Sequence, residues 1–444
     1  MKDARTAAYS ALLQVDVNAG YSNIVIDKAI KEAELDKRDA SLAAAIFYGV
    51  LERRLTLDYY IGRFSKIPIA GIAPEILEIL RIACYQILYM EKIPHSAAVN
   101  EAVNMVKGIK GGKSPGFVNG VLRNLLRKYN SVRMPDIKKY PLKAMSIMYS
   151  CPEWIIQLWQ TAYGNHHTMG LLESFFNKPP LFVRVNTTKV TAQQLIECLE
   201  EEQVTAKIVP WLSDAVELHN TGAVANLKAY ERGLFHVQDL SSQLCCHMLN
   251  PKLGQTIADL CAAPGGKTFT LAELMDNKGK LLSFDKYKGK VGLIRQGAQR
   301  LGLSIIEACI RDSSNPKEAI FLADSVLCDV PCAGLGIIRR KPEIRYKPQE
   351  DLKELPAIQK EILQEAAKQV KSGGTLIYST CSLNPAENGN VADWFIQTHP
   401  DFQPKQLCLP KRIERVVDHE QNQITLLPHI HGTDGFFIAA FIKK

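Results

Sequence analysis

The chain has 444 residues, of which 46% are hydrophobic and 23% charged, and its formal net charge is +8. This length predicts two or three domains, and the composition excludes collagen-like, coiled-coil and wholly disordered chains. No apolar run approaches the ~20 residues of a membrane-spanning helix, and the first residues lack the unbroken apolar stretch of a secretory signal. We therefore expect a cytoplasmic protein, a monomer, with no membrane partner.

The cysteine pattern argues against both a disulfide framework and a metal site. The chain has 11 cysteines, an odd number, and no two of them are spaced as CxxC. The pair Cys245-Cys246 beside His247 lacks the second half of a zinc motif. We expect no metal, with most thiols buried as small hydrophobes in a reducing compartment.

Residues 1–135 have the apolar spacing of an all-helical domain. Apolar side chains recur at three- and four-residue intervals, and Pro68, Pro74 and Pro94 separate the segments. The helices are expected over residues 4–15, 39–64, 74–90, 95–109 and 117–129. Residues 136–175 are expected to form a helical connector, with a helix over 153–164.

The remainder of the chain mixes strands with helices. Residues 176–235 predict a small α+β subdomain, with strands over 181–188 and 205–210 around a helix over 191–202. From residue 236 to 444 short apolar strands alternate with amphipathic helices, which predicts an α/β doubly wound, Rossmann-like domain. In such a domain the carboxyl ends of the parallel strands share one edge of the sheet, where ligands bind.

Two stretches of the chain are basic and poor in acids. Between Ala102 and Pro135 there is no acidic residue. A charge run is often a solvated face, but two of them favour a polyanionic partner. The basic residues are Lys107, Lys110, Lys113, Arg123, Arg127, Lys128 and Arg133 in the first stretch, and Arg339, Arg340, Lys341, Arg345 and Lys347 in the second.

A glycine-rich loop follows the first strand of the predicted parallel sheet, in the sequence DLCAAPGGKT from Asp259 to Thr268. Glycines between a strand and a helix let a ligand approach the backbone, and the helix start offers free N–H groups. The end of this loop matches a phosphate-binding loop, but Cys261 stands where that motif needs its first glycine. A tight turn without a ligand remains an alternative at this point.

Acidic residues end the next two predicted strands. Asp285 lies where doubly wound folds hold ribose hydroxyls, although it is equally suited to cap a helix. Asp312 follows the third strand, where an adenine edge would lie, although the SSNP sequence after it also favours a plain turn.

Two cysteines follow the fourth and fifth strands, in the segments Asp329-Val-Pro-Cys332 and Ser379-Thr-Cys381. Neighbouring parallel strands would bring both thiols to the edge that carries the glycine loop. A lone cysteine at a strand end is usually inert, but a pair beside an acid favours chemistry. Since the thiolate is the nucleophile, we expect the flexible basic loop after Cys332 to lower a thiol pKa.

Several of these motifs resemble a known family. DLCAAPGGKT, DVPCAGLG with RRKPEIRYK, YSTCSLNPAENGNVADWF and DGFFIAAFIK resemble the RNA cytosine-5 methyltransferases that use S-adenosylmethionine (SAM). IPHSAAVNEAVNMVKG and GFVNGVLRNLLRK resemble the helical fold of the antitermination factor NusB. The combination is similar to the members that act on 16S ribosomal RNA, free or in the assembling small subunit, and it covers nearly the whole chain.

The resemblance implies roles for the strand-tip residues. Cys381 would add to C6 of cytosine, Cys332 would help release the product, and Asp329, if protonated, would hydrogen-bond N3. Asp285 would bind the ribose of SAM, Asp312 would lie on its adenine side, and Asp329 would lie between SAM and the base. The methionine part would be wrapped by the loop residues Cys261, Ala262, Ala263, Pro264, Gly265, Gly266 and Lys267.

Two other functions stay open on the residues alone. A nucleic-acid-binding NTPase is suggested by Gly266-Lys267-Thr268, although the missing glycine at position 261 and the two thiols count against it. A non-catalytic RNA-binding assembly factor would keep the same fold, but it would not need Cys332 and Cys381. For the RNA contact itself we expect Lys107, Lys110, Lys113, Arg123, Arg127, Lys128, Arg339, Arg340 and Lys341 to take part.

Overall fold

The computed structural model describes residues 3–18, 22–109, 114–417 and 420–444. The chain forms two compact units, Met1–Asn177 with Ile338–Lys347 and Lys178–Ile337 with Pro348–Lys444. Within the described residues, no helix is both long and apolar enough to cross a membrane.

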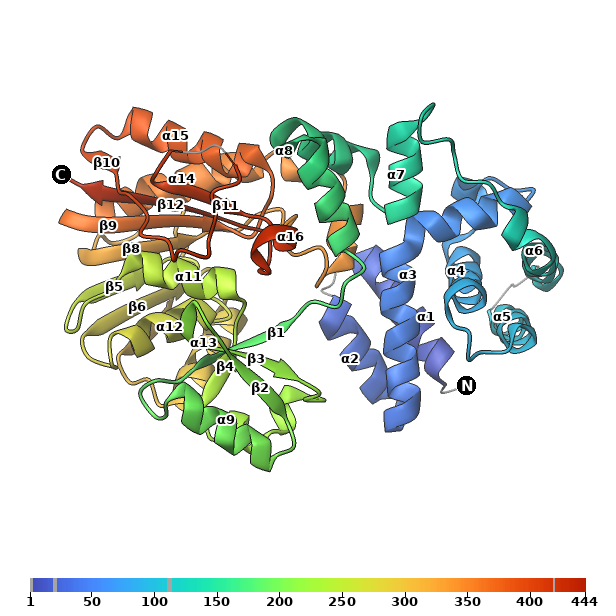
Figure 1. The fold of residues 1–444 in the computed structure, drawn as a ribbon, viewed down its shortest axis with the longest axis horizontal. Coiled ribbons are helices and arrows are strands. Elements are labelled where there is room, and N and C mark those ends of the chain that lie inside the picture. Colours follow the sequence, from blue (N-terminus) through green and yellow to red (C-terminus); the bar gives the residue numbers. More distant parts are fainter. Residues whose placement is uncertain (1–2, 19–21, 110–113, 418–419) are drawn as a thin grey trace. The chain divides into compact units, whose positions relative to one another are not determined.

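The first unit is built from helices (Figure 1), as the apolar periodicity predicts. They bury a continuous apolar cluster that includes Phe47, Leu80 and Leu122. Pro74 and Pro115 occupy the first positions of α4 and α6, where the missing N–H costs nothing. The helices are α1 (Ala4–Asn18), α2 (Ser22–Ala33), α3 (Lys37–Phe64), α4 (Pro74–Tyr89), α5 (His95–Gly108), α6 (Pro115–Lys128), α7 (Pro141–Tyr149) and α8 (Glu153–Ser174), with the short turns η1 (Ile69–Gly71) and η2 (Tyr129–Ser131).

Helix α8 extends ten residues beyond the predicted end at residue 164. Gly164 has φ +75°, so the helical path breaks there and then resumes. A left-handed backbone at this position favours glycine, which explains why the sequence pattern predicts an end to the helix.

The segment 338–347 belongs to the helical unit rather than to the sheet that precedes it in the chain. Its turn η4 (Pro342–Tyr346) carries Arg345, which is fully buried. The guanidinium donates to the carbonyl oxygen of Ser150 over 3.1 Å and lies 4.5 Å from the ring centre of Phe175. The expectation of a flexible basic loop is therefore wrong for this part, because Arg345 is bound to carbonyls of the unit's own core.

The second unit begins with a small antiparallel sheet of strand order β2-β3-β1-β4. Helix α9 starts with a capping box between Thr191 and Gln194. Strand β3 was missing from the sequence prediction. The elements are β1 (Leu181–Val185), α9 (Ala192–Glu201), β2 (Thr205–Val209), β3 (Leu212–His219), η3 (Val224–Asn226), α10 (Lys228–Glu231) and β4 (Phe235–Val237).

An eight-stranded sheet forms the rest of this unit, in the order β10-β12-β9-β8-β5-β6-β7 with β11 paired to β12. Its elements are α11 (Leu240–Leu249), β5 (Thr256–Asp259), α12 (Gly266–Leu274), β6 (Lys280–Asp285), α13 (Lys288–Leu301), β7 (Ile306–Ile310), β8 (Ala323–Asp329), η5 (Glu350–Leu352), α14 (Leu355–Gln369), β9 (Val370–Thr380), η6 (Pro385–Glu387), α15 (Gly389–Thr398), β10 (Phe402–Pro404), β11 (Gln423–Leu426), α16 (Pro428–His431) and β12 (Phe436–Lys443).

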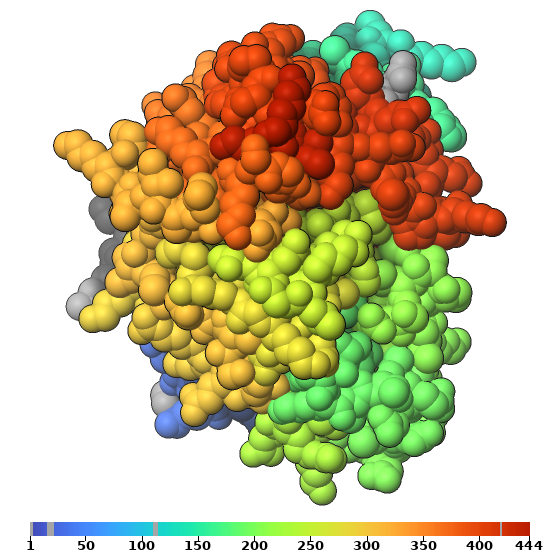
Figure 2. Space-filling model, turned by 90° about the vertical axis from the view of Figure 1, so that its left-hand side faces the viewer, coloured from blue at the N-terminus to red at the C-terminus, as the bar shows by residue number. Residues whose placement is uncertain are grey.

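Strands β5 to β9 are parallel, whereas β12 runs antiparallel to β9. Apolar side chains of α11, α12 and α13 pack on one face of the sheet, and those of α14 and α15 pack on the other. This doubly wound arrangement confirms the predicted Rossmann-like fold. Figure 2 shows the molecule in space-filling form from the side of this unit, with its green, yellow, orange and red residues facing the viewer.

Candidate active site

Two thiols meet where β8 and β9 end. Asp329 is the last residue of β8 and pairs in register with Ser379 of the parallel neighbour β9. The chain reaches Cys332 three residues later and Cys381 directly after β9, and the two Sγ atoms lie 3.0 Å apart. Both side chains are partly exposed. The prediction that the two cysteines share one edge of the sheet is confirmed.

The Cys332 thiol is held in its protonated form. Its pKa lies well above the ordinary value because of its hydrogen bond with Cys381 and because of burial, and the charges of Glu387 and Asp329 add to the effect. The expectation that the basic loop lowers a thiol pKa is therefore wrong for Cys332. The hydrogen bond with Cys381 and the burial of this sulfur are the largest causes of the rise.

Asp329 connects the thiols to the glycine loop. One carboxylate oxygen accepts from Ser379 Oγ over 2.8 Å, and the other lies 2.6 Å from Lys267 Nζ. The ion pair raises the pKa of Lys267 against the effect of its burial. Lys267, which we expected at the cofactor, thus also fixes the acid between the two strand tips.

The loop from residue 260 to 266 is held between two strands. Leu260 N donates to Leu327 O over 3.0 Å, and Ala262 N donates to Phe284 O over 2.8 Å. Gly265 has φ +113°, and a Cβ built there would lie 2.4 Å from the ring of Phe269. Glycine is therefore required at position 265, which directly precedes α12, and the first N–H groups of that helix can bind an anion.

Asp259, the first residue of this motif, is buried beneath the loop. Its Oδ2 accepts from Thr268 Oγ1 over 2.7 Å. Burial raises the pKa of Asp259 to about 7. The motif made Asp259 visible in the sequence, but its burial was not predicted.

The two other acids lie where the strand pattern predicts them. Asp285 ends β6 and is buried, with Oδ1 accepting from Tyr287 N over 3.0 Å. Asp312 lies two residues beyond β7 and 2.8 Å from Lys286 Nζ, and this hydrogen bond lowers the pKa of Asp312. Together with the loop after β5 they line the carboxyl edge of three adjacent strands.

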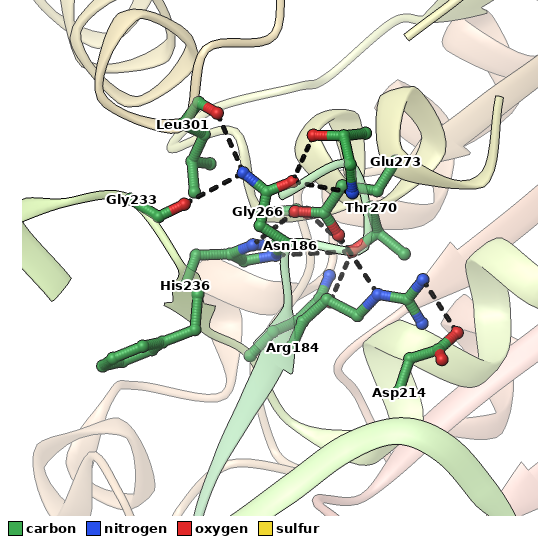
Figure 3. A network of polar contacts seen from close by, with 12 residues as sticks. Arg184, Asn186, Asp214, Gly233, His236, Gly266, Thr270, Glu273 and Leu301 are labelled. Atoms are coloured by element: carbon green, nitrogen blue, oxygen red, sulfur yellow. Dashed lines mark hydrogen bonds and ion pairs between the residues drawn. The ribbon is translucent and has the colours of Figure 1, made fainter. Parts of the chain in front are cut away.

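A buried polar network supports α12 from behind (Figure 3). Arg184 of β1 is fully buried and forms ion pairs with Glu273 of α12 and with Asp214 of β3, at 3.1 and 3.2 Å. His236 of β4 lies 3.4 Å from the same Glu273. The small sheet thus anchors the helix that begins at the glycine loop. The sequence did not predict this network, because the pattern around Arg184 indicates only a strand and not the partners of its side chain.

The remaining cysteines show no metal-binding arrangement. Among the described residues, no group of three His, Cys, Asp or Glu side chains could hold a metal ion. Cys245 and Cys246 are buried, and burial raises the pKa of Cys245 to about 12.

The structure describes most, but not all, of the basic residues that we expected to contact RNA. Lys107 lies at the end of α5, and Arg123, Arg127 and Lys128 lie on α6; all four side chains are exposed. Lys110 and Lys113 fall outside the described residues. Arg339, Arg340 and Lys341 are half-buried, in the segment that joins the helical unit.

Comparisons with known proteins agree on the architecture and the class. A family model described as 16S rRNA methyltransferase RsmB/F matches residues 246–442, the NusB family model matches 2–127, and a model of the ferredoxin-like domain of RsmF/B-like methyltransferases matches 151–225. A crystal structure of PH0851 covers all of this chain and 98% of its own, with 27% identity and a TM-score of 0.83. This chain, with its Rossmann-like sheet, its glycine loop and two thiols at the strand ends, is therefore a methyltransferase.

Curated relatives refine the family. The probable ribosomal RNA small subunit methyltransferase B of Bacillus subtilis is 39% identical over 99% of this chain and 98% of its own length. The ribosomal RNA small subunit methyltransferase B of Escherichia coli O1:K1 is 31% identical over 100% of this chain and 99% of its own. The chain belongs to the ribosomal RNA small subunit methyltransferase B family.

Proposed function

We propose that this enzyme transfers a methyl group from SAM to C5 of a cytosine in 16S ribosomal RNA, through a covalent bond between Cys381 and C6 of the base. The observation that carries the proposal is the 3.0 Å contact between the Cys332 and Cys381 sulfurs, at the sheet edge that also carries the glycine loop. Membership of a methyltransferase family favours this function over nucleotide hydrolysis and over a purely structural role.

The loop after β5 suits SAM as the methyl donor. The turn at Gly265 leads directly into the N-terminus of α12, and residues Cys261 to Lys267 would hold the methionine part of SAM. Asp285 would bind the ribose hydroxyls, and Asp312 would lie toward the adenine. When bound, SAM supplies an electrophilic methyl group on its sulfonium.

Cytosine needs activation before C5 can accept a methyl group, because the aromatic ring makes C5 a poor nucleophile. Addition of the Cys381 thiolate to C6 breaks the aromaticity and moves electron density to C5. Cys332, whose raised pKa keeps it protonated, is the weaker candidate for the nucleophile, and Cys381 therefore takes that role in the proposal. After methylation, a base takes up the C5 proton while the C6–sulfur bond breaks and its electron pair restores the Cys381 thiolate. Cys332 would be this base once its own proton has passed to water.

Asp329 is suited to stabilise the charge that develops at N3 of the base. Both of its oxygens accept hydrogen bonds, from Ser379 and Lys267. Donation to N3 would require Asp329 to carry a proton, because a carboxylate oxygen can only accept a hydrogen bond.

The RNA must present its cytosine unstacked, at a cost of roughly a few kcal/mol that a loop reduces. We propose that the exposed basic residues of α5 and α6 contact the phosphate backbone, together with Lys110, Lys113, Arg339, Arg340 and Lys341. The absence of acidic residues between Ala102 and Pro135 supports the assignment, because no carboxylate of this stretch would repel a phosphate.

The test is methyl transfer from labelled SAM to unmodified small-subunit RNA, with the product base mapped. We expect label in 5-methylcytosine, no label with Cys381→Ala, and RNA trapped covalently on Cys381 with Cys332→Ala. Cys408→Ala, an exposed cysteine elsewhere in the chain, is the control and should match the wild type. Normal turnover by Cys332→Ala would contradict the division of labour, and label on another base would contradict the reaction.

A further inference from the structure

Both cysteine-bearing loops are bound to a single buried carboxylate. Glu387, in the turn η6, has no exposed surface. Its Oε2 accepts from the backbone N–H of Ala333, the residue after Cys332, over 2.8 Å. Its Oε1 accepts from Oγ of Ser382, the residue after Cys381, over 2.7 Å.

Further contacts fix Glu387 itself. Gln359 Nε2 of α14 donates to Glu387 Oε2 over 3.0 Å and to the carbonyl oxygen of Pro331 over 2.9 Å. The Tyr378 hydroxyl of β9 donates to the backbone oxygen of Glu387 over 2.5 Å. The carboxyl group of Glu387 therefore receives donors from three separate segments, and both of its oxygens have hydrogen-bond partners.

We propose that Glu387 is a positioning residue, which holds the backbones after Cys332 and Cys381 in place and so sets the separation of the two sulfurs. The inference deepens the proposed function and rests on it for its meaning in catalysis. Thiol pairs react only within narrow geometry, and each Sγ here is one residue away from a group that Glu387 binds.

The charge of Glu387 also raises the pKa of Cys332, as the neighbouring groups do. Cys381 at the tip of β9, Asp329 on β8 and Glu387 on η6 all raise the pKa of Cys332, in addition to its hydrogen bond with Cys381 and its burial. The Tyr378 hydroxyl also interacts with Cys332. A test of position must therefore compare variants that carry the same charge.

The experiment measures how fast Cys332 and Cys381 form a disulfide when diamide is added to the RNA-free protein. Diamide takes up both thiol hydrogens, and peptide mass spectrometry quantifies the bond. Glu387→Ala is compared with Glu387→Gln, which also lacks the charge but keeps the shape and can still accept from one of the two loops. Ser382→Ala is compared with the wild type, because it removes a single hydrogen bond and no charge. Glu361→Gln, an exposed glutamate of α14, is the charge control.

We expect Glu387→Ala to form the disulfide severalfold more slowly than Glu387→Gln, and Ser382→Ala severalfold more slowly than the wild type. Glu361→Gln should match the wild type. If Glu387→Ala does not fold, the Ser382→Ala comparison decides alone. A wild-type rate for Ser382→Ala would overturn the proposal. Since neither RNA nor SAM is present, failure here is distinct from failure of methyl transfer.

Discussion

Lys267 Nζ lies 2.6 Å from Asp329 Oδ2, and this ion pair joins the loop after β5 to the tip of β8. The two side chains are 11% and 29% exposed, so water screens them only in part. The contact couples the proposed methyl-donor site to the acid beside the thiols.

Replacing Lys267 by Met should weaken SAM binding about tenfold or more. The change leaves Asp329 without its cation and removes a charge from the proposed methionine pocket. Calorimetric titration with SAM measures the effect. Lys280→Met is the control. Lys280 begins β6, at the end of the strand away from Asp285, and forms an exposed ion pair with Glu307, so this variant should bind SAM normally. Equal affinity of Lys267→Met and wild type would refute the coupling.

Arg184→Ala should destabilise the second unit by about 3–5 kcal/mol. The fully buried Glu273 would lose its ion pair while its charge stayed in the interior. Thermal unfolding measures the destabilisation. Lys353→Ala, in an exposed pair with Glu350 at 70% and 74% exposure, should change stability by less than about 1 kcal/mol. If the two variants unfold alike, the network is not a support for α12.

The stability of the fold should depend on Asp259 between about pH 4 and pH 7. Its pKa in the folded chain is raised from 3.8 to about 7 by burial. The stabilisation is complete below about pH 4, where the acid is neutral in both states, and is lost as pH rises through about 7. Wild type should therefore lose stability relative to Asp259→Asn over this window, by up to about 1.4 kcal/mol per pH unit.

Urea unfolding of both proteins at pH 5 and pH 8 tests this dependence. Asp351→Asn, an exposed acid, serves as the control and should follow the wild type at both pH values. Parallel profiles of wild type and Asp259→Asn would show that Asp259 does not titrate in this window.

Removing three charges from α6 should weaken RNA binding and its salt dependence together. Each phosphate that a basic side chain no longer neutralises lowers the slope of log affinity against log salt, so Arg123→Ala, Arg127→Ala and Lys128→Ala combined should reduce it by ~2. Filter binding at several salt concentrations measures the slope. The control combines Lys37→Ala, Lys66→Ala and Lys143→Ala, exposed residues of the same unit. An unchanged slope would place the RNA contact elsewhere.

Much of the architecture could be predicted because it depends on local pattern. Apolar spacing identified α3, α4 and α6, and the alternation of strands and helices identified the parallel sheet. Strand β3 was missed because its charged residues, such as Asp214, interrupt the alternation that marks a strand. Asp214 is retained there by its ion pair with Arg184, a contact that no local pattern contains.

The sequence alone determined which chemical groups end each strand, since Asp259, Asp285, Asp329 and Cys381 follow from where apolar runs stop. Only the tertiary structure decided how those groups are held. Ala333 and Glu387 are 54 residues apart, and Arg184 and Glu273 are 89 apart. Burial, ion pairing and pKa depend on neighbours that folding brings together. The raised pKa of Cys332 and the hydrogen bonds from Arg345 to backbone carbonyls could therefore be found only in the folded chain.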